Sequence, residues 1–407
     1  MADVLRPVAP GERIPALDLL RGWAMFGVLW ANLNWGYYGT REPVTGLDHA
    51  LSWTQQWMLD GRFYSLLTLL FGIGFGIQLT RADLQAVDLR SMYYRRTAAL
   101  LVIGIVHGTL IYHGDILTLY ALVAFALVMF RTASTKRTLV AALLLFFIGP
   151  LIVREAMFLS GLRFWMPDSA GESAAVYAHG SWLQIESARI GGYLQKLGRF
   201  GLVLYVTILA SFLVGLWSVK SGYVRRVFDE PRSTRRLLAV ALGATAVGYA
   251  MSHWLGTVWP HTQAPADYIP AFPFPYFQLN MLRTLVLGPF DQASVVGGAV
   301  AYACVLLLIW QRARGKRLLR PLAATGRMAL TTYLTQSIVC TLLFYSYGLG
   351  WYGSVGFTGM LLITLILFGC QMAASTWWLG RFRYGPAEWL WRTLTYGHAP
   401  KMRLAPA

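Results

Sequence analysis

The first long apolar run of the chain, Ala16–Trp35, carries an acid, an arginine and an asparagine inside a stretch long enough to span a membrane. Charged groups are costly in hydrocarbon, so Asp18, Arg21 and Asn32 form a candidate functional site. Asp18 and Arg21 are three residues apart and lie on one helical face. Arg21 and Asn32 share a face about 16 Å apart along the axis. An ion pair at the membrane surface, with Asn32 in a helix–helix hydrogen bond, is the competing interpretation.

The composition indicates a membrane protein with several spans and excludes a soluble fold. Hydrophobic residues make up 56% of the 407 residues and charged residues 13%, whereas soluble domains have about a quarter charged. The net charge of +17 would suit nucleic acid, but the Lys and Arg residues lie between apolar runs and not along one polar face. This is the positive-inside pattern of membrane proteins, so we expect no nucleic-acid partner.

The apolar runs predict an all-α bundle of about ten transmembrane helices in one integral-membrane domain, residues 1–407. Each run is near the length that crosses about 30 Å of hydrocarbon. With ten spans, every strongly basic loop falls on the same side as both termini, which predicts that both termini face the cytoplasm. The predicted spans are Ala16–Trp35, Arg62–Leu79, Arg96–Tyr112, Asp115–Phe130, Thr138–Leu159, Phe200–Val219, Leu237–Leu255, Phe290–Trp310, Arg327–Tyr347 and Val355–Leu379.

Two long outer loops and a basic tail complete the predicted organisation. The loop at about 160–199 contains a predicted surface helix near 181–198. The loop at about 257–289 is rich in proline and aromatic residues, so it cannot form one uninterrupted span. The tail, 381–407, alternates aromatic and basic residues, which is typical of a cytoplasmic interfacial anchor.

A histidine and an aspartate flank the tight connection between the third and fourth predicted spans. His107 lies inside the third span, and Asp115 opens the fourth, where a carboxylate suits a helix N-terminus. A His within reach of an Asp is a reasonable pair of base and orienting group. A structural hydrogen bond with an N-capping Asp is the alternative, and His113 is most simply a solvated loop residue.

The ninth predicted span is unusually polar. Arg327 lies at its inner end, where it could contact a phosphate or anchor the helix. Thr332, Tyr333 and Gln336 are expected to face the bundle interior and not lipid. In the second span, the alternating glycines of residues 72–76 favour close helix packing.

Several motifs, in order along nearly the whole chain, resemble the YeiB-type family of bacterial inner-membrane proteins. That resemblance implies a multi-pass protein of the bacterial inner membrane. The motifs are Leu17-Asp18-x-x-Arg21-Gly22 with Asn32, Leu69-Leu70-Phe71-Gly72-x-Gly74, His107-Gly108 with Gly114-Asp115-Ile116-Leu117, Gly326-Arg327-Met328-Ala329-Leu330-Thr331-x-Tyr333-Leu334-x-Gln336, and Gly385-Pro386-x-Glu388-Trp389-Leu390-Trp391-Arg392.

That family is similar, more distantly, to the transmembrane acyltransferase superfamily, which includes the lysosomal heparan-sulfate N-acetyltransferase and bacterial enzymes that O-acetylate envelope sugars. Their first span carries Asp-x-x-Arg-Gly with His or Asn eleven residues after the Arg, as in Arg21 and Asn32. The resemblance implies a cytoplasmic acyl donor, usually acetyl-CoA, an acceptor on the far side, and a His acting as base or acyl carrier. The catalytic His that follows the Asn in the heparan enzyme corresponds to Pro43 in this chain, so His107 with Asp115 is the substitute candidate.

We therefore expect a membrane acyltransferase with a transmembrane acyltransferase-like bundle. It would move an acyl group from acetyl-CoA or another acyl-CoA to a hydroxyl or amine of an envelope glycan or lipid. No metal is expected, and an oligomer is compatible with the sequence. The candidates are His107, Asp115 and Asn32 for catalysis, Arg21 and Arg327 for the donor phosphates, and Asp18, Tyr333, Gln336 and His113 for the substrate pocket.

Two other functions explain the same polar residues. A transporter or flippase for a small polar or lipid-linked solute would use them to line a pathway, without cleaving a thioester. A non-catalytic membrane scaffold would use them to fix helix register, and it predicts a packed interior with no cavity.

Overall fold

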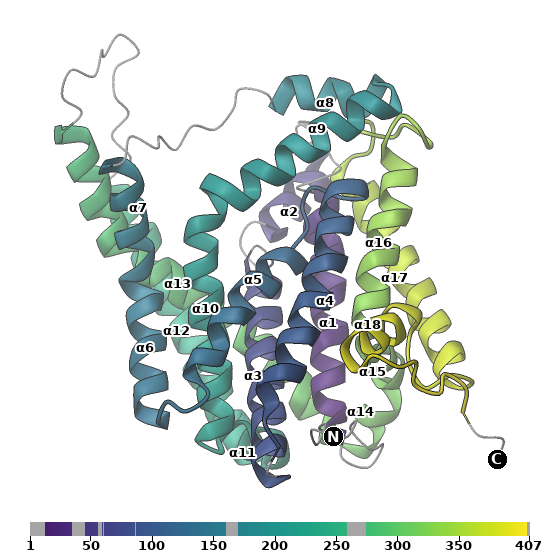
Figure 1. The fold of residues 1–407 in the computed structure, drawn as a ribbon. Helices are drawn as coiled ribbons and strands as arrows, with labels where there is room; N and C mark the ends of the chain where they lie inside the picture. Colours follow the sequence, from purple (N-terminus) through teal and green to yellow (C-terminus); the bar gives the residue numbers. More distant parts are fainter. Residues whose placement is uncertain are drawn as a thin grey trace.

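The protein is an all-α membrane protein, as predicted. The computed structural model describes residues 13–34, 45–55, 59, 61–85, 87–159, 170–258 and 274–404. Within these ranges the chain is helical, with one isolated bridge between Phe382 and Arg403 and no strand. Most of the long helices run along one direction, and α1 begins at the lower end of the view (Figure 1).

The helices follow one another along the chain with short connections between most of them. They are α1 (Pro15–Asn32), α2 (Gly46–Thr54), α3 (Arg62–Leu84), α4 (Leu89–Leu110), α5 (Leu117–Leu127), the 3₁₀ turn η4 (Val128–Phe130), α6 (Thr135–Phe147), α7 (Gly149–Leu159), α8 (Ala170–His179), α9 (Trp182–Gln195), the π-helical turn η5 (Lys196–Phe200), α10 (Gly201–Lys220), α11 (Tyr223–Asp229), α12 (Pro231–Val258), α13 (Phe274–Trp310), α14 (Ala313–Leu318), α15 (Arg320–Arg327), α16 (Ala329–Phe344), α17 (Phe357–Leu379) and α18 (Pro386–Tyr396).

Each of the ten ranges predicted as spans overlaps a helix, and the fifth range is divided at Ile148 into α6 and α7. By length and composition, five segments of the described chain could cross a membrane, whereas α5 with η4 and α16 are shorter apolar helices. The five segments are Arg62–Leu84, Gly201–Lys220, Pro231–Val258, Val286–Trp310 and Phe357–Leu379.

The structure moves the start of one predicted helix and locates the predicted surface helix. The helix predicted to start at Phe290 begins at Phe274 as α13 and includes Pro275 and Pro289. Pro275 is tolerated because the first turn of a helix has no internal partner for its N–H. Residues 259–273 of the predicted outer loop lie outside the described residues. The surface helix predicted near 181–198 is α9, which starts with a capping box.

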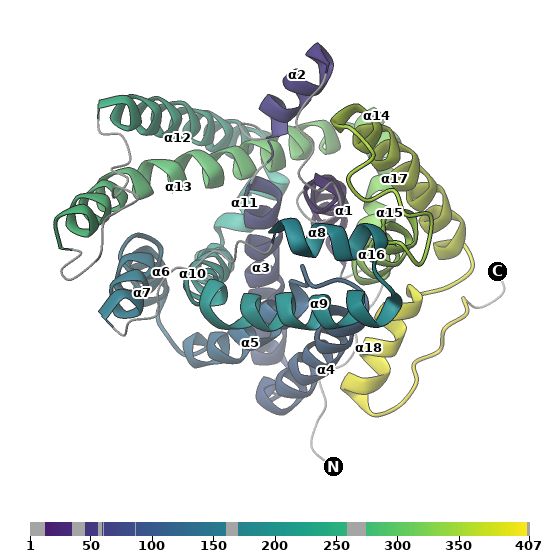
Figure 2. The same cartoon turned by 90° about the horizontal axis from the view of Figure 1, so that it is seen from above.

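Helix α1 lies inside the bundle and contacts α3, α15, α16 and α17. Helices α8 and α9 lie across the end opposite the start of α1 (Figure 1), and the α12–α13 pair projects sideways from the bundle (Figure 2). We call the end where α1 begins the N-terminal face and the end covered by α8 and α9 the far face. Of the polar residues of α1, Asp18 is buried in this packing, and Arg21 and Asn32 are half-buried.

At the far face, Asp48 of α2 fastens that short helix to the start of α17. Its Oδ1 accepts hydrogen bonds from the Thr358 N–H at 2.9 Å and the Thr358 hydroxyl at 2.8 Å. Asp48 also closes a capping box with Thr45. The hydrogen bonds from Thr358 lower the pKa of the Asp48 carboxyl from 3.8 to about 2.

We expect Asp48→Asn to lower the thermal unfolding temperature of the detergent-purified protein at pH 7. A lowered pKa means that the folded state favours the ionised carboxylate, so its contribution is full above the unfolded pKa and is lost as pH falls toward 2. The difference between wild type and variant should therefore narrow between pH 5 and about pH 3. Asp229→Asn is the matched control. The Asp229 side chain is exposed, and its Oδ2 lies 3.9 Å from Nε of the exposed Arg225, so the same substitution there removes only a surface ion pair. A difference that is constant with pH would contradict this role.

Candidate functional site

Two glycines bring α1 and α15 into backbone contact and fix the position of two arginines. A Cβ built on Gly22 would overlap the carbonyl oxygen of Leu322, and a Cβ on Gly326 would overlap that of Asp18. Arg21 and Arg327 are the chain neighbours of these glycines. The Arg-Gly of the first motif and the Gly-Arg of the fourth are thus two sides of one close helix crossing.

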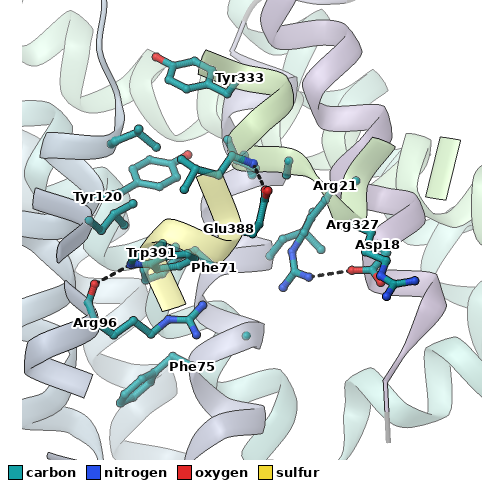
Figure 3. Close-up of a pocket in the computed structure, with 18 of the residues that line it drawn as sticks. Asp18, Arg21, Phe71, Phe75, Arg96, Tyr120, Arg327, Tyr333, Glu388 and Trp391 are labelled. Atoms are coloured by element: carbon teal, nitrogen blue, oxygen red, sulfur yellow. Dashed lines mark hydrogen bonds and ion pairs between the residues drawn. The ribbon is translucent and has the colours of Figure 1, made fainter. Parts of the chain in front are cut away.

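A cavity of about 220 Å³ lies beside this crossing, lined by residues of α1, α3, α4, α5, α15, α16 and α18. One part of its wall is cationic and the rest is largely apolar and aromatic (Figure 3). Phe71, Phe75, Tyr120 and Tyr333 supply aromatic rings. The cavity therefore suits a ligand that joins an anionic group to a small apolar group.

The cationic wall consists of five arginines from four helices and the segment before α1. In Figure 3, Arg21 and Arg327 lie beside Asp18, and Arg96 lies across the view from them, below Trp391. Arginine guanidinium groups bind carboxylate and phosphate oxygens in a bidentate manner, so such a wall recognises an anion. The five lining residues are Arg13, Arg21, Arg96, Arg327 and Arg392.

Among the residues that the structure describes, two carboxylates line the cavity, and both are engaged. Asp18, whose side chain is 6% exposed, pairs with Arg13 at 2.8 Å and with Arg21 at 3.1 Å. Glu388 Oε1 accepts the N–H of Leu330 at 2.7 Å at the start of α16. Within the described ranges no carboxylate forms an ion pair with the other three arginines. The cavity thus keeps an excess of positive charge for a ligand.

Helix α18 forms one wall of the cavity, which differs from the expectation that the basic tail is only an interfacial anchor. It packs against α4 and α16. The Trp391 indole N–H donates to the carbonyl of Arg96 at 2.8 Å, and the Arg96 guanidinium lies 4.0 Å from the Trp391 ring centroid. Its alternation of aromatic and basic residues therefore serves the cavity and not only a membrane surface.

The predicted His–Asp pair is present and fully buried. His107 Nδ1 lies 2.8 Å from Asp115 Oδ1, with the side chains 1% and 0% exposed. Asp115 also accepts the N–H of Thr118 at 2.8 Å, which caps the start of α5. With Asp115 Oδ1 as the acceptor, we assign the donor role in this hydrogen bond to the Nδ1–H of His107. Its Nε2 is buried without a hydrogen-bond partner among the described residues.

Tyr333 connects this pair to the cavity. Its ring lines the cavity, and its centroid lies 4.9 Å from that of His107, with the rings tilted by 47°. The Tyr333 hydroxyl is buried close to the backbone of Ile116, which also lines the cavity. His107 does not itself line the cavity, so the Tyr333 side chain separates the histidine from the cavity.

The other predicted site residues lie elsewhere. Asn32 is half-buried near the end of α1, does not line the cavity and makes no hydrogen bond with His107 or Asp115. Gln336 is buried as predicted. Its Nε2 donates hydrogen bonds to the Met25 carbonyl at 3.4 Å and to Gln371 Oε1 at 3.0 Å, which connects α16 to α1 and α17.

His113 packs under α8 at the far face. Its ring stacks on that of Tyr177 at 5.8 Å. Burial, with the charges of Lys196 and Arg189, lowers the pKa of His113 to about 4, so it is neutral at pH 7. It is a packed loop histidine, not the solvated one of the simplest interpretation.

The cavity also contains residues that the sequence did not single out as site residues. They are Arg13, Arg96, Glu388, Trp391 and Arg392. Arg96 and Arg392 stand in basic clusters, and such clusters are ordinarily explained by membrane orientation. The motif Gly385-Pro386-x-Glu388 could have indicated that the tail contributes to the cavity. An acidic residue in an otherwise basic segment needs a hydrogen-bond or ion-pair partner, and this partner can lie on another helix.

Comparisons with known proteins agree with the resemblance seen in the motifs. A family model described as "Protein of unknown function (DUF418)" matches residues 264–398. The chain is 30% identical over 421 residues to "Uncharacterized protein YxaH" of Bacillus subtilis (strain 168), with 96% of each chain covered. It is 30% identical over 417 residues to "Uncharacterized protein YeiB" of Escherichia coli (strain K12), covering 94% of this chain and 96% of YeiB. No solved structure matches the chain. The chain therefore belongs to the family of YeiB and YxaH.

Proposed function

We propose that this protein is a membrane acyltransferase of the bacterial inner membrane. It takes an acyl group from a thioester donor such as acetyl-CoA at the N-terminal face, which is the cytoplasmic side. The acyl group passes to a hydroxyl or amine of an envelope glycan or lipid that approaches from the far face. The chain crosses the membrane about ten times in this proposal, with both termini in the cytoplasm.

The single observation that carries the proposal is that one side chain, Tyr333, separates an arginine-lined cavity from a buried histidine. Arg21 and Arg327 lie on the cationic side of the cavity, and Tyr333 at its edge packs on His107. An acyl thioester of a phosphorylated carrier has the matching chemistry, with phosphates for the arginines and a small apolar group for the aromatic wall.

In the proposed reaction His107 acts as general base and then as general acid. Its Nε2 takes the proton of the acceptor hydroxyl or amine while the acceptor oxygen or nitrogen attacks the thioester carbonyl. The carbon–sulfur bond then breaks, and the leaving thiolate takes that proton from the imidazolium. Asp115 holds the ring through Nδ1 and stabilises the imidazolium. Tyr333 must move aside for the acceptor hydroxyl or amine to reach Nε2 while it attacks a thioester held in the cavity.

The cavity also fits the second candidate, a transporter, because it has a cationic entrance and is closed from His107 by one tyrosine. A transporter binds its solute without chemical change, so release of a thiol distinguishes the two. The presence of a cavity favours both over a packed scaffold.

We expect purified wild-type protein to bind acetyl-CoA saturably in calorimetry and to release free thiol when an acceptor is present. Arg21→Gln and Arg327→Gln should each weaken binding about tenfold, because each removes a charge-assisted hydrogen-bond donor. Arg317→Gln is the matched control, since Arg317 is exposed and does not line this cavity. Absence of binding at millimolar donor, or binding without thiol release under any acceptor, would overturn the proposal.

A further inference from the structure

A second and larger pocket lies on the other side of the α1–α15 crossing. Its volume is about 900 Å³, and it lies among the start of α1, the α11–α12 junction, α14, α15 and the end of α17. We call it the α15 pocket. It shares Arg13, Asp18 and Arg327 with the arginine-lined cavity described above. These shared residues make the two spaces adjoining compartments and not independent sites.

The α15 pocket adds two further cations to those it shares. Lys316 of α14 and Arg320 of α15 both line it and are exposed to solvent. Its carboxylates are Asp18, already paired with two arginines, and the exposed Asp229. The lining therefore carries an excess of positive charge that is accessible from the N-terminal face.

The pocket also has an apolar wall suited to a flat ring. Trp310 at the end of α13 and Phe228 of α11 are half-buried lining residues, and Leu379 of α17 joins them. A wall of this kind next to Lys and Arg side chains offers stacking for a heterocycle and donors for its phosphates. The two compartments differ about fourfold in volume, 900 against 220 Å³. A bulky polyanionic part of a ligand fits the larger space, and a narrow part fits the smaller.

We propose that the α15 pocket binds the phosphorylated nucleotide of the acyl donor, through Lys316 and Arg320, while Arg13 and Arg327 bridge to the cavity that receives the acyl group. This assignment rests on the proposed function for the identity of the donor. Because the nucleotide contacts lie outside the cavity next to His107, nucleotide binding can be tested separately from acyl transfer.

Adenosine 3′,5′-bisphosphate, which has no thioester and no acyl group, tests the pocket directly. We expect it to bind protein in phosphatidylcholine nanodiscs, measured by calorimetry. Lys316→Gln and Arg320→Gln should each raise its dissociation constant about tenfold. Arg317→Gln is the matched control. It removes one positive charge from α14, the helix of Lys316, at an exposed position that does not line the pocket. It should change the constant less than twofold.

Acetyl-pantetheine, a thioester without the nucleotide, separates this inference from the proposed function. If the nucleotide binds through Lys316 and Arg320 but no thioester is ever cleaved, the pocket assignment stands and the acyltransferase proposal fails. If acetyl-pantetheine is cleaved but the bisphosphate does not bind, the pocket assignment fails. It also fails if Arg317→Gln weakens bisphosphate binding as much as Lys316→Gln and Arg320→Gln do. The pocket assignment also fails if the bisphosphate does not bind in phosphatidylcholine nanodiscs and the protein instead shows a Lys316-dependent preference for nanodiscs that contain phosphatidylglycerol, since the anion would then be a lipid headgroup.

Discussion

The His107→Gln variant is expected to lose acyl transfer by about 10²- to 10⁴-fold, which is the usual contribution of a positioned general acid–base group. Glutamine can keep a hydrogen bond to Asp115 but has no basic nitrogen at the position of Nε2. Acetyl-CoA affinity should stay within about twofold of wild type, because the arginines that hold the donor are unchanged. Rates of thiol release and calorimetric affinity, measured on the same preparation, check both parts.

His113→Gln is the matched control for this experiment. His113 is a second histidine of the same connection, half-buried, but it packs on Tyr177 under α8 and does not line the cavity. Its replacement should leave the rate within a few fold of wild type. Unfolding temperatures of both variants show whether either has lost its structure. A His107→Gln protein that is folded and transfers acyl groups at the wild-type rate would contradict the assigned role.

The fold was largely predictable because hydrophobic run length reports directly on helices in a membrane. The ten predicted ranges each overlap a helix, and Thr332, Tyr333 and Gln336 are buried, as their polarity in an apolar run indicated. The break at Ile148 does not register in hydropathy, but Gly149-Pro150 marks it in the sequence, because proline ends a preceding helix and is tolerated in the first turn of the next one, here α7.

The site was predictable only in the parts that break the apolar pattern. Arg21 and Asp18 interrupt a span, so sequence reasoning finds them, and the eight-residue separation of His107 and Asp115 fits one tight turn. Arg96 and Arg392 lie in basic clusters, where one cation facing a cavity is indistinguishable from its solvent-exposed neighbours. Which arginine turns inward depends on tertiary contacts, such as the Trp391 hydrogen bond to the Arg96 carbonyl, and these are not local.

Replacing Gly326 by alanine should destabilise the protein more than any single change on the surface of the bundle. A Cβ at this position would overlap the carbonyl oxygen of Asp18 and would also meet the backbone N–H of Gly22. Backbone atoms cannot move to another rotamer, so α1 and α15 must separate. Overpacking of this kind costs about 3 kcal/mol in the free energy of unfolding. We expect a lower unfolding temperature and a weaker acetyl-CoA affinity together, because the spacing of Arg21 and Arg327 depends on the same crossing.

Gly369→Ala isolates the contact from the intrinsic effect of the substitution. Gly369 lies inside α17, and a Cβ built there meets nothing within 4 Å. Alanine is a better helix former than glycine by about 0.8–1 kcal/mol, so this control should be neutral or slightly stabilised. If Gly326→Ala unfolds at the same temperature as Gly369→Ala and binds the donor equally well, the α1–α15 crossing does not set the positions of the two arginines. The donor site would then have to depend on α4 and α18, whose Arg96 and Arg392 approach the cavity independently of that crossing.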